Sequence, residues 1–260
     1  MKRLINDIKK YYRYLIYASA SELKSEVANS YLGWIWWILE PTLFMFVYIF
    51  VSFVVFRNKE QYFPIFVFVG LSSWQFFDKT LKQSVKLVSA NKSVVSKIYL
   101  PKFILILIRI AVNGFKMFIS YGLIVLMLFV YRVPISLNIL FVVPLVITLM
   151  LFTFGLSCLM LHFGVFVEDL SNVLYIFLKF VFYLTGIFFS VEKRVPKPWN
   201  AFLLKLNPVA FIIDSLRKSI IYAESIDVFG LFVWFFVSLI ISSMGLLLIY
   251  KYENTYVKVI

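Results

Sequence analysis

The chain has 260 residues, of which 62% are hydrophobic and 15% charged, and its formal net charge at pH 7 is +13. This composition lies far outside the range of soluble domains, so it excludes a water-soluble enzyme and indicates an integral membrane protein. Cys158 is the only cysteine, which excludes a disulfide framework and a thiolate metal cluster. We therefore expect no metal site and no nucleic-acid partner.

Residues 1–30 predict a basic amphipathic helix that lies on the membrane surface. Lysine and arginine residues fill the gaps between apolar positions that recur at helical spacing. These apolar positions are Leu4, Ile8, Tyr11, Tyr12, Leu15 and Ile16.

The rest of the chain predicts an all-α integral membrane fold with six transmembrane helices in a single domain, residues 1–260. Each apolar stretch has at least 17 residues, the lower end of the range for helices that cross a hydrocarbon core about 30 Å thick. The predicted spans cover residues 34–56, 62–78, 103–131, 137–162, 170–191 and 227–250. With both termini in the cytoplasm, and with residues 192–226 set aside, the inner segments hold 14 lysine and arginine residues against three outside. The positive-inside rule favours this orientation.

Two connecting segments between the spans have a distinctive composition. Residues 79–101 are basic and predicted to be cytoplasmic, and "SVKLVSANKSVV" within them predicts a short helix. Residues 192–226, between the fifth and sixth spans, contain two apolar pieces, about 199–206 and 208–216, separated by Asn207 and Pro208. Each piece is too short to cross the membrane, so a re-entrant outer helical hairpin is predicted. Within it we expect Asp214 and Arg217 to pair, because residues three apart share a helix face.

Three predicted spans carry polar or aromatic side chains on one face. Ionisable groups inside spans are costly and often mark a pathway, so these faces are candidates for a substrate path. The alternative is that Arg109 and Lys179 extend to the lipid headgroups while the aromatic rings face lipid or the core. We expect Glu40 to pair with Arg109, with a water-exposed Glu40 as the alternative. The candidate path residues are Trp37, Glu40, Phe44, Tyr48, Arg109, Lys116, Tyr175, Lys179, Phe182 and Phe189.

Catalytic signatures are sparse. The sequence has no Gly-x-x-x-x-Gly-Lys-[Ser/Thr] loop, so it cannot hold ATP phosphates in that way. Two embedded carboxylates for acid–base chemistry on sugars are also missing. His162 is interpreted as an interfacial residue, and Glu168 with Asp169 as a solvated helix start rather than a metal pair.

Several motifs resemble the membrane subunits of ABC type-2 polysaccharide exporters. "SYLGWIWWILEPTLFMFVY" resembles their first span and "FVGLSSWQFF" (68–77) their second. "ANKSVVSKIYLPK" (90–102) is similar to their cytoplasmic segment, and "FTFGLS" (152–157) to their fourth span. "FVEDLSNVL" (166–174), "NPVAFIIDSLR" (207–217) and the closing "KYENTYVKVI" match their inner loop, outer hairpin and O-antigen-type tail. The inner loop departs from the family where Glu168 stands in place of a common arginine, which puts charge pairing there in doubt.

The resemblance implies a homodimer that works with two copies of a cytoplasmic ABC ATPase subunit in the bacterial inner membrane. It implies export of an undecaprenyl-linked polysaccharide, O-antigen above all, with capsular and teichoic-acid permeases as alternatives. The chain itself would be no enzyme and would hold no cofactor, because ATP and Mg²⁺ bind the partner. The expected coupling residues are Val85, Lys86, Leu87, Ser89, Asn91 and Lys92. The expected outer gate residues are Trp199, Asn207, Pro208, Asp214 and Arg217. Outside this class, a membrane-embedded glycosyl- or acyltransferase and a channel remain open.

Overall fold

A computed structural model of the protein describes residues 2–28, 30–52 and 60–259, and the part of the chain that it describes is helical without any β-strand. The first half comprises α1 (Lys2–Val27), η1 (Gly33–Ile35), α2 (Trp36–Phe50), α3 (Phe63–Val85), α4 (Leu87–Ala90), α5 (Lys92–Val95) and α6 (Lys102–Val130). The second half comprises η3 (Leu137–Phe141), α7 (Val142–Phe166), α8 (Leu170–Leu184), α9 (Val191–Arg194), α10 (Trp199–Leu206), α11 (Pro208–Arg217), η4 (Lys218–Tyr222) and α12 (Val228–Val259).

Among the described residues, four helical stretches are long and apolar enough to cross a membrane: Gly33–Phe50, Lys102–Val130, Leu137–Phe166 and Val228–Tyr256. The chain is therefore a multi-pass membrane protein. α8 is apolar but has only 15 residues. α3 carries Asp78, Lys79 and Lys82 in its second half, which lowers its mean hydropathy.

The predicted spans agree with the helices except at several ends. The fifth span was expected to continue to residue 191, but α8 ends at Leu184. Shortly afterwards Gly186 takes a φ of +68°, which ends helical geometry and suits glycine. The sixth span continues past residue 250, because α12 reaches Val259. The predicted residues 53–56 of the first span lie outside the described part of the chain.

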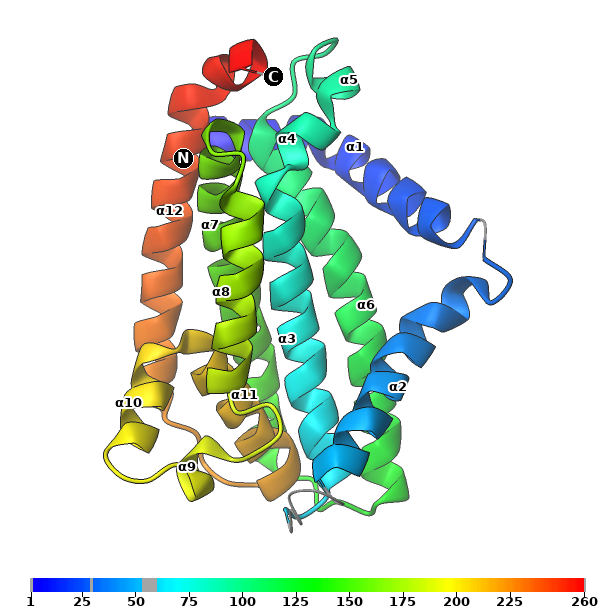
Figure 1. Ribbon diagram of the computed structural model, residues 1–260, viewed down its shortest axis with the longest axis vertical. Helices are drawn as coiled ribbons and strands as arrows, with labels where there is room; N and C mark the ends of the chain where they lie inside the picture. The colour runs from blue at the N-terminus through cyan, green and yellow to red at the C-terminus, as the bar shows by residue number, and fades with distance from the viewer. Residues whose placement is uncertain (1, 29, 53–59, 260) are drawn as a thin grey trace.

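α3 is the central helix of the bundle. It packs against α2, α6, α7, α8 and α11, and most of its side chains are buried (Figure 1). Because neighbouring helices cover it on nearly every side, α3 accommodates hydroxyl, amide and charged side chains that lipid would disfavour. Its serine and threonine hydroxyl groups are consequently buried, whereas Asp78, Lys79 and Lys82 are partly exposed.

α7 and α12 approach each other through small residues. A Cβ atom on Gly155 would lie 2.7 Å from the backbone nitrogen of Ser242, and one on Gly245 would lie 2.6 Å from Cβ of Cys158. The Ser242 hydroxyl also donates a hydrogen bond to the carbonyl of Leu151 at 2.9 Å. Small residues and interhelical hydrogen bonds are typical of close helix packing in membranes.

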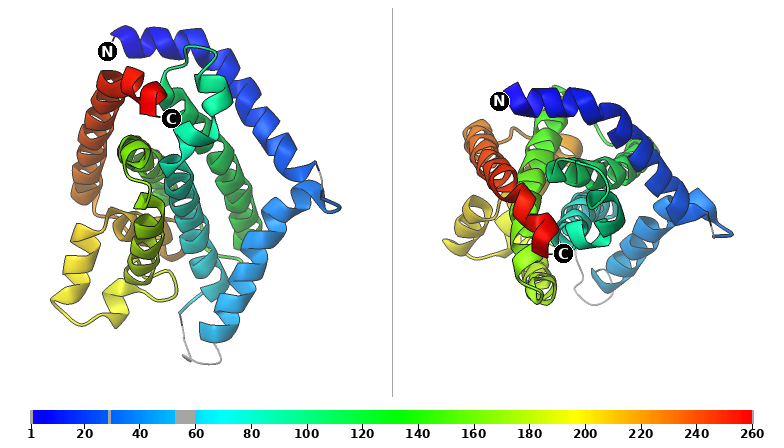
Figure 2. Two further views of the ribbon diagram at one scale, coloured as in Figure 1. Left: turned by 45° about the horizontal axis from the view of Figure 1, so that its top comes forward. Right: turned by 90° about the horizontal axis from the view of Figure 1, so that it is seen from above.

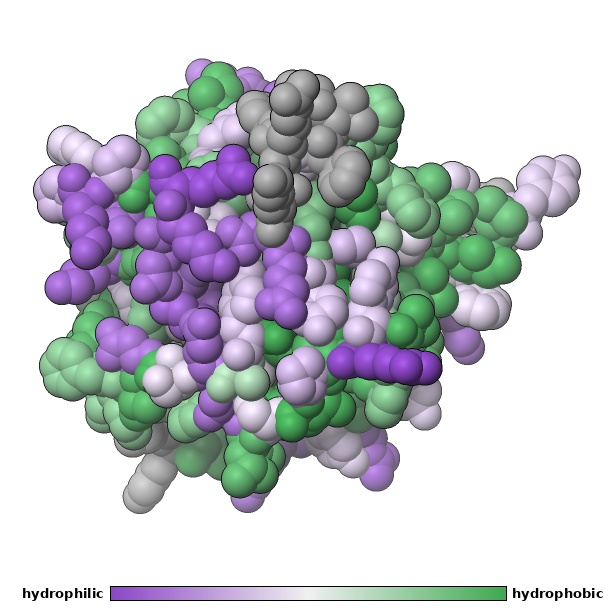
Figure 3. Space-filling model, turned by 90° about the horizontal axis from the view of Figure 1, so that it is seen from below, coloured by the Kyte–Doolittle hydropathy of each residue, from purple (hydrophilic) through white to green (hydrophobic). Residues whose placement is uncertain are grey.

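The connecting segments lie at opposite ends of the bundle. The two termini, the start of α1 and helices α4 and α5 are at one end, whereas α9 and α10 are at the other (Figures 1 and 2). Hydrophilic side chains gather on the face at the α9–α10 end (Figure 3). The expected placement of residues 79–101 and 192–226 on opposite sides of the membrane is compatible with this arrangement.

α1 has one face on the protein and another exposed. Leu4, Tyr11, Tyr14, Leu15, Ala18 and Leu23 pack against the core. A second stripe of apolar side chains at three- and four-residue spacing is exposed, formed by Ile5, Ile8, Tyr12 and Ile16. An exposed apolar stripe on a basic helix fits the predicted contact with the membrane surface.

Candidate functional site

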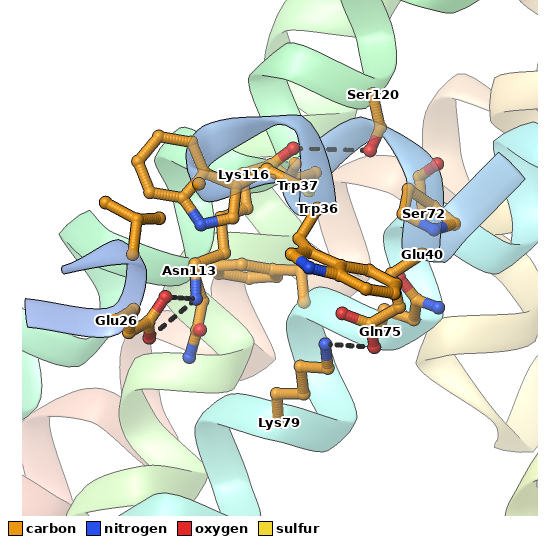
Figure 4. A pocket seen from close by; sticks show the side chains of 15 residues that line it. Glu26, Trp36, Trp37, Glu40, Ser72, Gln75, Lys79, Asn113, Lys116 and Ser120 are labelled. Atoms are coloured by element: carbon orange, nitrogen blue, oxygen red, sulfur yellow. Dashed lines mark hydrogen bonds and ion pairs between the residues drawn. The ribbon is translucent and has the colours of Figure 1, made fainter. Parts of the chain in front are cut away.

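A polar cavity of about 190 Å³ lies where the end of α1 and the start of α2 meet the middle of α3 and α6 (Figure 4). α2 contributes Trp36, Trp37 and Pro41 to its wall. Proline has no amide hydrogen, so the carbonyl of Trp37, four residues earlier, loses its helical donor beside the cavity. The polar side chains that line the cavity are Glu26, Glu40, Ser72, Gln75, Lys79, Asn113, Lys116 and Ser120.

Two ion pairs lie across this cavity. Lys79 of α3 is 2.8 Å from a carboxylate oxygen of Glu40 on α2. Lys116 of α6 donates to Glu26 of α1, also at 2.8 Å. The four charges cancel, so the cavity has no formal net charge at neutral pH.

The predicted pair between Glu40 and Arg109 is wrong. Arg109 pairs with Glu22 of α1 and lines a different cavity, together with Tyr14 and Asn91. Arg109 precedes Lys116 by seven residues, or about 10 Å along a helix. Only Lys116 therefore reaches the depth of the cavity beside α2.

Asn113 and Ser72 contribute polar atoms without a partner. The Asn113 side chain is 3% exposed, and its amide nitrogen donates to Thr80 at 3.0 Å and to Gln83 at 2.9 Å. Within the described part of the chain, neither its carbonyl oxygen nor the hydroxyl of Ser72, which is 2% exposed, has a hydrogen-bond partner. We call these two atoms the open groups. Buried polar atoms are nearly always paired, so two unpaired ones in one cavity call for an explanation.

An aromatic cluster lies further along α2. The Tyr48 ring centroid is 4.2 Å from that of Phe188 and 6.4 Å from those of Phe44 and Phe182. Phe182 also contacts Trp74 of α3, at 5.5 Å. The structure thus joins three predicted path residues, Phe44, Tyr48 and Phe182, although Phe188 takes the place predicted for Phe189.

Tyr175 and Lys179 form a separate group on α8. The ammonium of Lys179 lies 4.3 Å from the ring centroid of Tyr175, and that of Lys82 on α3 lies 4.8 Å from it. Both contacts have the geometry of cation–π interactions. Neither Tyr175 nor Lys179 lines the cavity.

The coupling segment is folded differently from the prediction. It forms two short helices, α4 and α5, in place of one. Val85 and Leu87, expected to contact a partner, are each only 2% exposed and belong to the core. The exposed side chains of the predicted set are Lys86, Ser89 and Lys92. Asn91 is half-buried and donates to the carbonyl of Leu87 at 2.8 Å.

The break between the two apolar pieces of residues 192–226 falls at Asn207 and Pro208, as expected. α10 ends at Leu206 and α11 begins at Pro208, while the Asn207 side chain accepts hydrogen bonds from the amides of Val209 and Ala210. This is an N-cap with proline at the first helical position. Trp199 is exposed at the start of α10.

The predicted pair between Asp214 and Arg217 is not formed. Asp214 pairs with Lys218 at 3.3 Å. Arg217 is buried and donates to the carbonyls of Phe66 at 3.1 Å and of Gly186 and Ile187 at 2.8 Å each. Arginine stays protonated in proteins, so the buried guanidinium of Arg217 is charged. Its side chain points into the protein, because three carbonyls match the forked donors of arginine.

His162 has a structural role. Its ring lies 2.7 Å from the hydroxyl of Tyr256 and packs against Phe166 and Tyr252. In the described residues, no three histidine, cysteine, aspartate or glutamate side chains gather as a metal ion would require. Glu168 is exposed in the turn before α8.

Comparisons with known proteins show similarity along most of the chain. An O-antigen export system permease protein RfbA of Klebsiella pneumoniae is 25% identical over 247 residues, which cover 95% of this chain and 94% of that protein. The chain resembles O-antigen export permeases over nearly its whole length. A protein of the same name from Myxococcus xanthus is 28% identical and covers 84% of each chain.

Similarity extends to a capsule-type transporter. The polysialic acid transport protein KpsM of Escherichia coli is 24% identical over 204 residues, or 76% of this chain and 78% of that protein. No protein-family model matches the chain. These comparisons confirm the resemblance that the motifs indicate.

Ser72 and Gln75 were missed by the sequence analysis. They lie within an apolar run, but with Lys79 they repeat at three and four residues, which places them on one face of α3. That spacing was the available signal. The facing helix, α6, was recognised through Lys116, four residues before Ser120.

Proposed function

We propose that this chain is the membrane-spanning permease subunit of an ATP-driven exporter of lipid-linked polysaccharide, with O-antigen as the expected cargo. The observation that carries the proposal is similarity to O-antigen export permeases over 95% of the chain. The similarity to KpsM supports a capsular polysaccharide as the second candidate cargo. The lipid carrier in this proposal is undecaprenyl diphosphate, in the bacterial inner membrane.

In the proposed topology α2, α3, α6, α7, α8 and α12 are the six spans. The N- and C-termini, α4 and α5 are cytoplasmic, whereas α10 and α11 form a re-entrant hairpin on the outer side. α8 has 15 residues and is about 22 Å long, shorter than a typical hydrocarbon core. Local thinning of the bilayer, or the segment that follows Leu184, would make up the difference.

We propose that the chain acts as a homodimer. In the apolar stretch of Gly33–Phe50 only 11% of the residues are buried, against 56% in that of Lys102–Val130. Phe44 on α2 and Phe177 and Phe180 on α8 are exposed. A second copy packed along α2 and α8 would enclose a path between the two subunits, lined by the aromatic cluster.

The path in this proposal uses aromatic rings as weak, repeated contacts. Sugar rings offer apolar C–H faces that rest against aromatic side chains. A path that moves many units must let each unit leave, so weak contacts at several positions suit it better than one tight site. The cluster of Phe44, Tyr48, Phe182 and Trp74 fits that requirement.

Energy for transport comes from a separate subunit in this proposal. The sequence has no phosphate-binding glycine-rich loop of the Walker type. Two copies of an ABC ATPase, which hold ATP and Mg²⁺, would dock at the end that carries α4 and α5. The chain itself then needs no cofactor and catalyses no reaction.

The proposal is tested by depleting the protein in its native host and following the lipid-linked glycan. We expect surface polysaccharide to disappear while lipid-linked glycan accumulates inside the cell. Unchanged surface polysaccharide would contradict the proposal. Loss of the glycan in both places would point to a transferase, because synthesis rather than export would have failed. Co-purification of an ATPase with the tagged chain is the second readout.

A further inference from the structure

We propose that the polar cavity between α1, α2, α3 and α6 binds one neutral sugar ring. The inference rests on the proposed function for the source of that sugar, which is the transported glycan. It adds a defined site to the proposal, separate from the aromatic cluster. The site can be tested on the purified chain without transport.

The first argument is the pair of open groups. Asn113 and Ser72 are almost completely buried and line the same cavity. Their open atoms are a carbonyl oxygen, which accepts, and a hydroxyl, which donates and accepts. Both atoms are themselves buried, so the Ser72 and Asn113 side chains must turn toward an occupant. A molecule with hydroxyl groups would then supply partners to both, because each hydroxyl is a donor and an acceptor at once.

The second argument is the charge balance. Two carboxylates and two ammonium groups lie around the cavity in the pairs Glu40–Lys79 and Glu26–Lys116. A phosphate or carboxylate ligand would meet two like charges, and an isolated cation would do the same. The balanced charges around the cavity therefore favour a neutral, polar ligand.

The third argument is the pair of indoles. Trp36 and Trp37 both line the cavity. Trp37 is held edge-on against Phe115 of α6 at 5.7 Å, which fixes its orientation. Aromatic faces beside a few placed polar groups are the combination that binds a ring with apolar C–H faces and polar edges.

The size of the cavity limits the occupant. Its volume of about 190 Å³ is below the roughly 300–1,000 Å³ of pockets for drug-sized ligands. A cavity of this volume can hold a single sugar ring. An oligosaccharide would have to extend out of the cavity, into the membrane or the cytoplasm. The proposed ligand is therefore one unit of a chain, or its terminal unit.

The test uses the full-length chain purified in lipid nanodiscs. The probes are the methyl glycosides of glucose, galactose, mannose and N-acetylglucosamine, and binding is measured by saturation-transfer NMR and tryptophan fluorescence. We expect at least one glycoside to bind saturably to the wild-type chain. Ser72→Ala should weaken that binding about three- to tenfold, as loss of one hydrogen bond does.

Matched controls separate binding from packing. The Ser157 hydroxyl is as deeply buried as that of Ser72 and likewise has no hydrogen-bond partner in the described residues, but it lies away from the cavity. Ser157→Ala should leave glycoside binding unchanged. Trp36→Leu should weaken it severalfold, whereas Trp34→Leu, on an exposed side chain that does not line the cavity, should not.

Three outcomes overturn the inference. The first is that none of the four glycosides binds saturably. The second is that the two serine variants, or the two tryptophan variants, bind alike. The third is that inorganic pyrophosphate binds in place of the glycosides and is lost in Lys116→Gln, which would assign the cavity to a lipid diphosphate. If glycosides bind but depletion leaves surface glycan unchanged, the proposed function fails and the cavity assignment stands.

Discussion

Arg217 joins three segments that are far apart in the sequence. Its guanidinium reaches α3 through Phe66 and the segment after α8 through Gly186 and Ile187, while its backbone belongs to α11. A charged donor buried with three carbonyls makes stronger hydrogen bonds than a neutral one. This one side chain thereby links α11 to α3 and to the segment after α8.

Gly70 is the position that makes room for this guanidinium. A Cβ atom there would lie 2.5 Å from Nη2 of Arg217. We expect Gly70→Ala to lower the free energy of unfolding by about 1–3 kcal/mol, the usual cost of overpacking. Cys158 is the single cysteine and is buried, so the onset of its reaction with a thiol dye on heating measures unfolding.

The control for this substitution is Gly122 on α6. A Cβ atom at Gly122 would meet nothing within 4 Å. Gly122→Ala should leave stability unchanged or raise it by up to about 1 kcal/mol, because alanine favours the helix. Equal effects of the two substitutions, or a loss in Gly70→Ala that is undiminished when Arg217 is also replaced by Ala, would contradict the role assigned to Arg217.

At the scale of elements, the hairpin of α10 and α11 decides the topology. Lys197 and Ser225 are exposed on its two sides. In a Cys158→Ser background, a single cysteine placed at either position should react with an impermeant thiol reagent added outside cells with a permeable outer barrier. The expectation follows from hairpin pieces of roughly 12–14 Å, which cannot cross a bilayer.

Ser96 supplies the matched control for the labelling. It is exposed and follows α5, at the opposite end of the bundle. A cysteine placed there should react only after the inner membrane is broken. Protection of the Lys197 or Ser225 position until that step would reverse the final span and refute the hairpin.

The coupling segment offers a second test at this scale. Lys86 and Ser89 are exposed, whereas Val85 and Leu87 are buried. We expect the double variant Lys86→Glu, Ser89→Asp to lose ATPase co-purification and glycan export at normal protein abundance. Val85→Asp or Leu87→Asp should instead reduce the amount of folded protein, because each buries a charge in the core. Normal export by the surface variant would exclude this surface from docking.

Sequence patterns located the elements far better than the contacts between them. The break at Asn207 and Pro208 was predictable because capping and proline geometry are local. The partner of Glu40 was not, since it depends on the axial register of α2 against α3 and α6. Those helices carry Lys79, Arg109 and Lys116, and only their placement in space selects Lys79 as the partner.

The same limit explains the buried valine and leucine of the coupling segment. At the end of α3 the apolar residues Val85, Leu87 and Val88 flank Lys86, a pattern compatible with a docking surface or with a core edge. α4 and α5 are single turns separated by Asn91, so their inward side chains differ from those of one continuous helix. The helix is interrupted at Lys86, where φ is −101°. No glycine or proline stands there to indicate the interruption in the sequence.

For the whole molecule, the aromatic cluster predicts where transport is most sensitive. Tyr48→Ala and Phe182→Ala should each slow glycan-stimulated ATP hydrolysis by the assembled transporter about fivefold, equivalent to about 1 kcal/mol per ring contact. Phe232→Ala and Phe236→Ala, on exposed rings of α12 away from α2 and α8, are the controls. Equal slowing in all four variants would favour a packing role for the cluster.

At the end of the bundle that carries α4 and α5 (Figure 1), one carboxylate links three segments. Glu253 of α12 accepts from Arg3 of α1 and, at 3.0 Å, from the hydroxyl of Tyr99 in the segment before α6. Tyr11 of α1 donates to the backbone carbonyl of Tyr99 at 2.9 Å. A displacement of this end of the molecule would therefore be transmitted to α1, α6 and α12 together.

The close contact between α7 and α12 also bears on how the protein is made. The residues that meet there, Gly155 and Cys158 on one helix and Ser242 and Gly245 on the other, are about 90 positions apart. During synthesis α7 enters the membrane well before α12 exists, so its small-residue face is first covered by lipid. We expect α12 to displace that lipid when it inserts. A chain truncated before α12 would leave the small-residue face of α7 uncovered, and we expect membrane quality-control proteases to degrade such a chain faster than the one that contains α12.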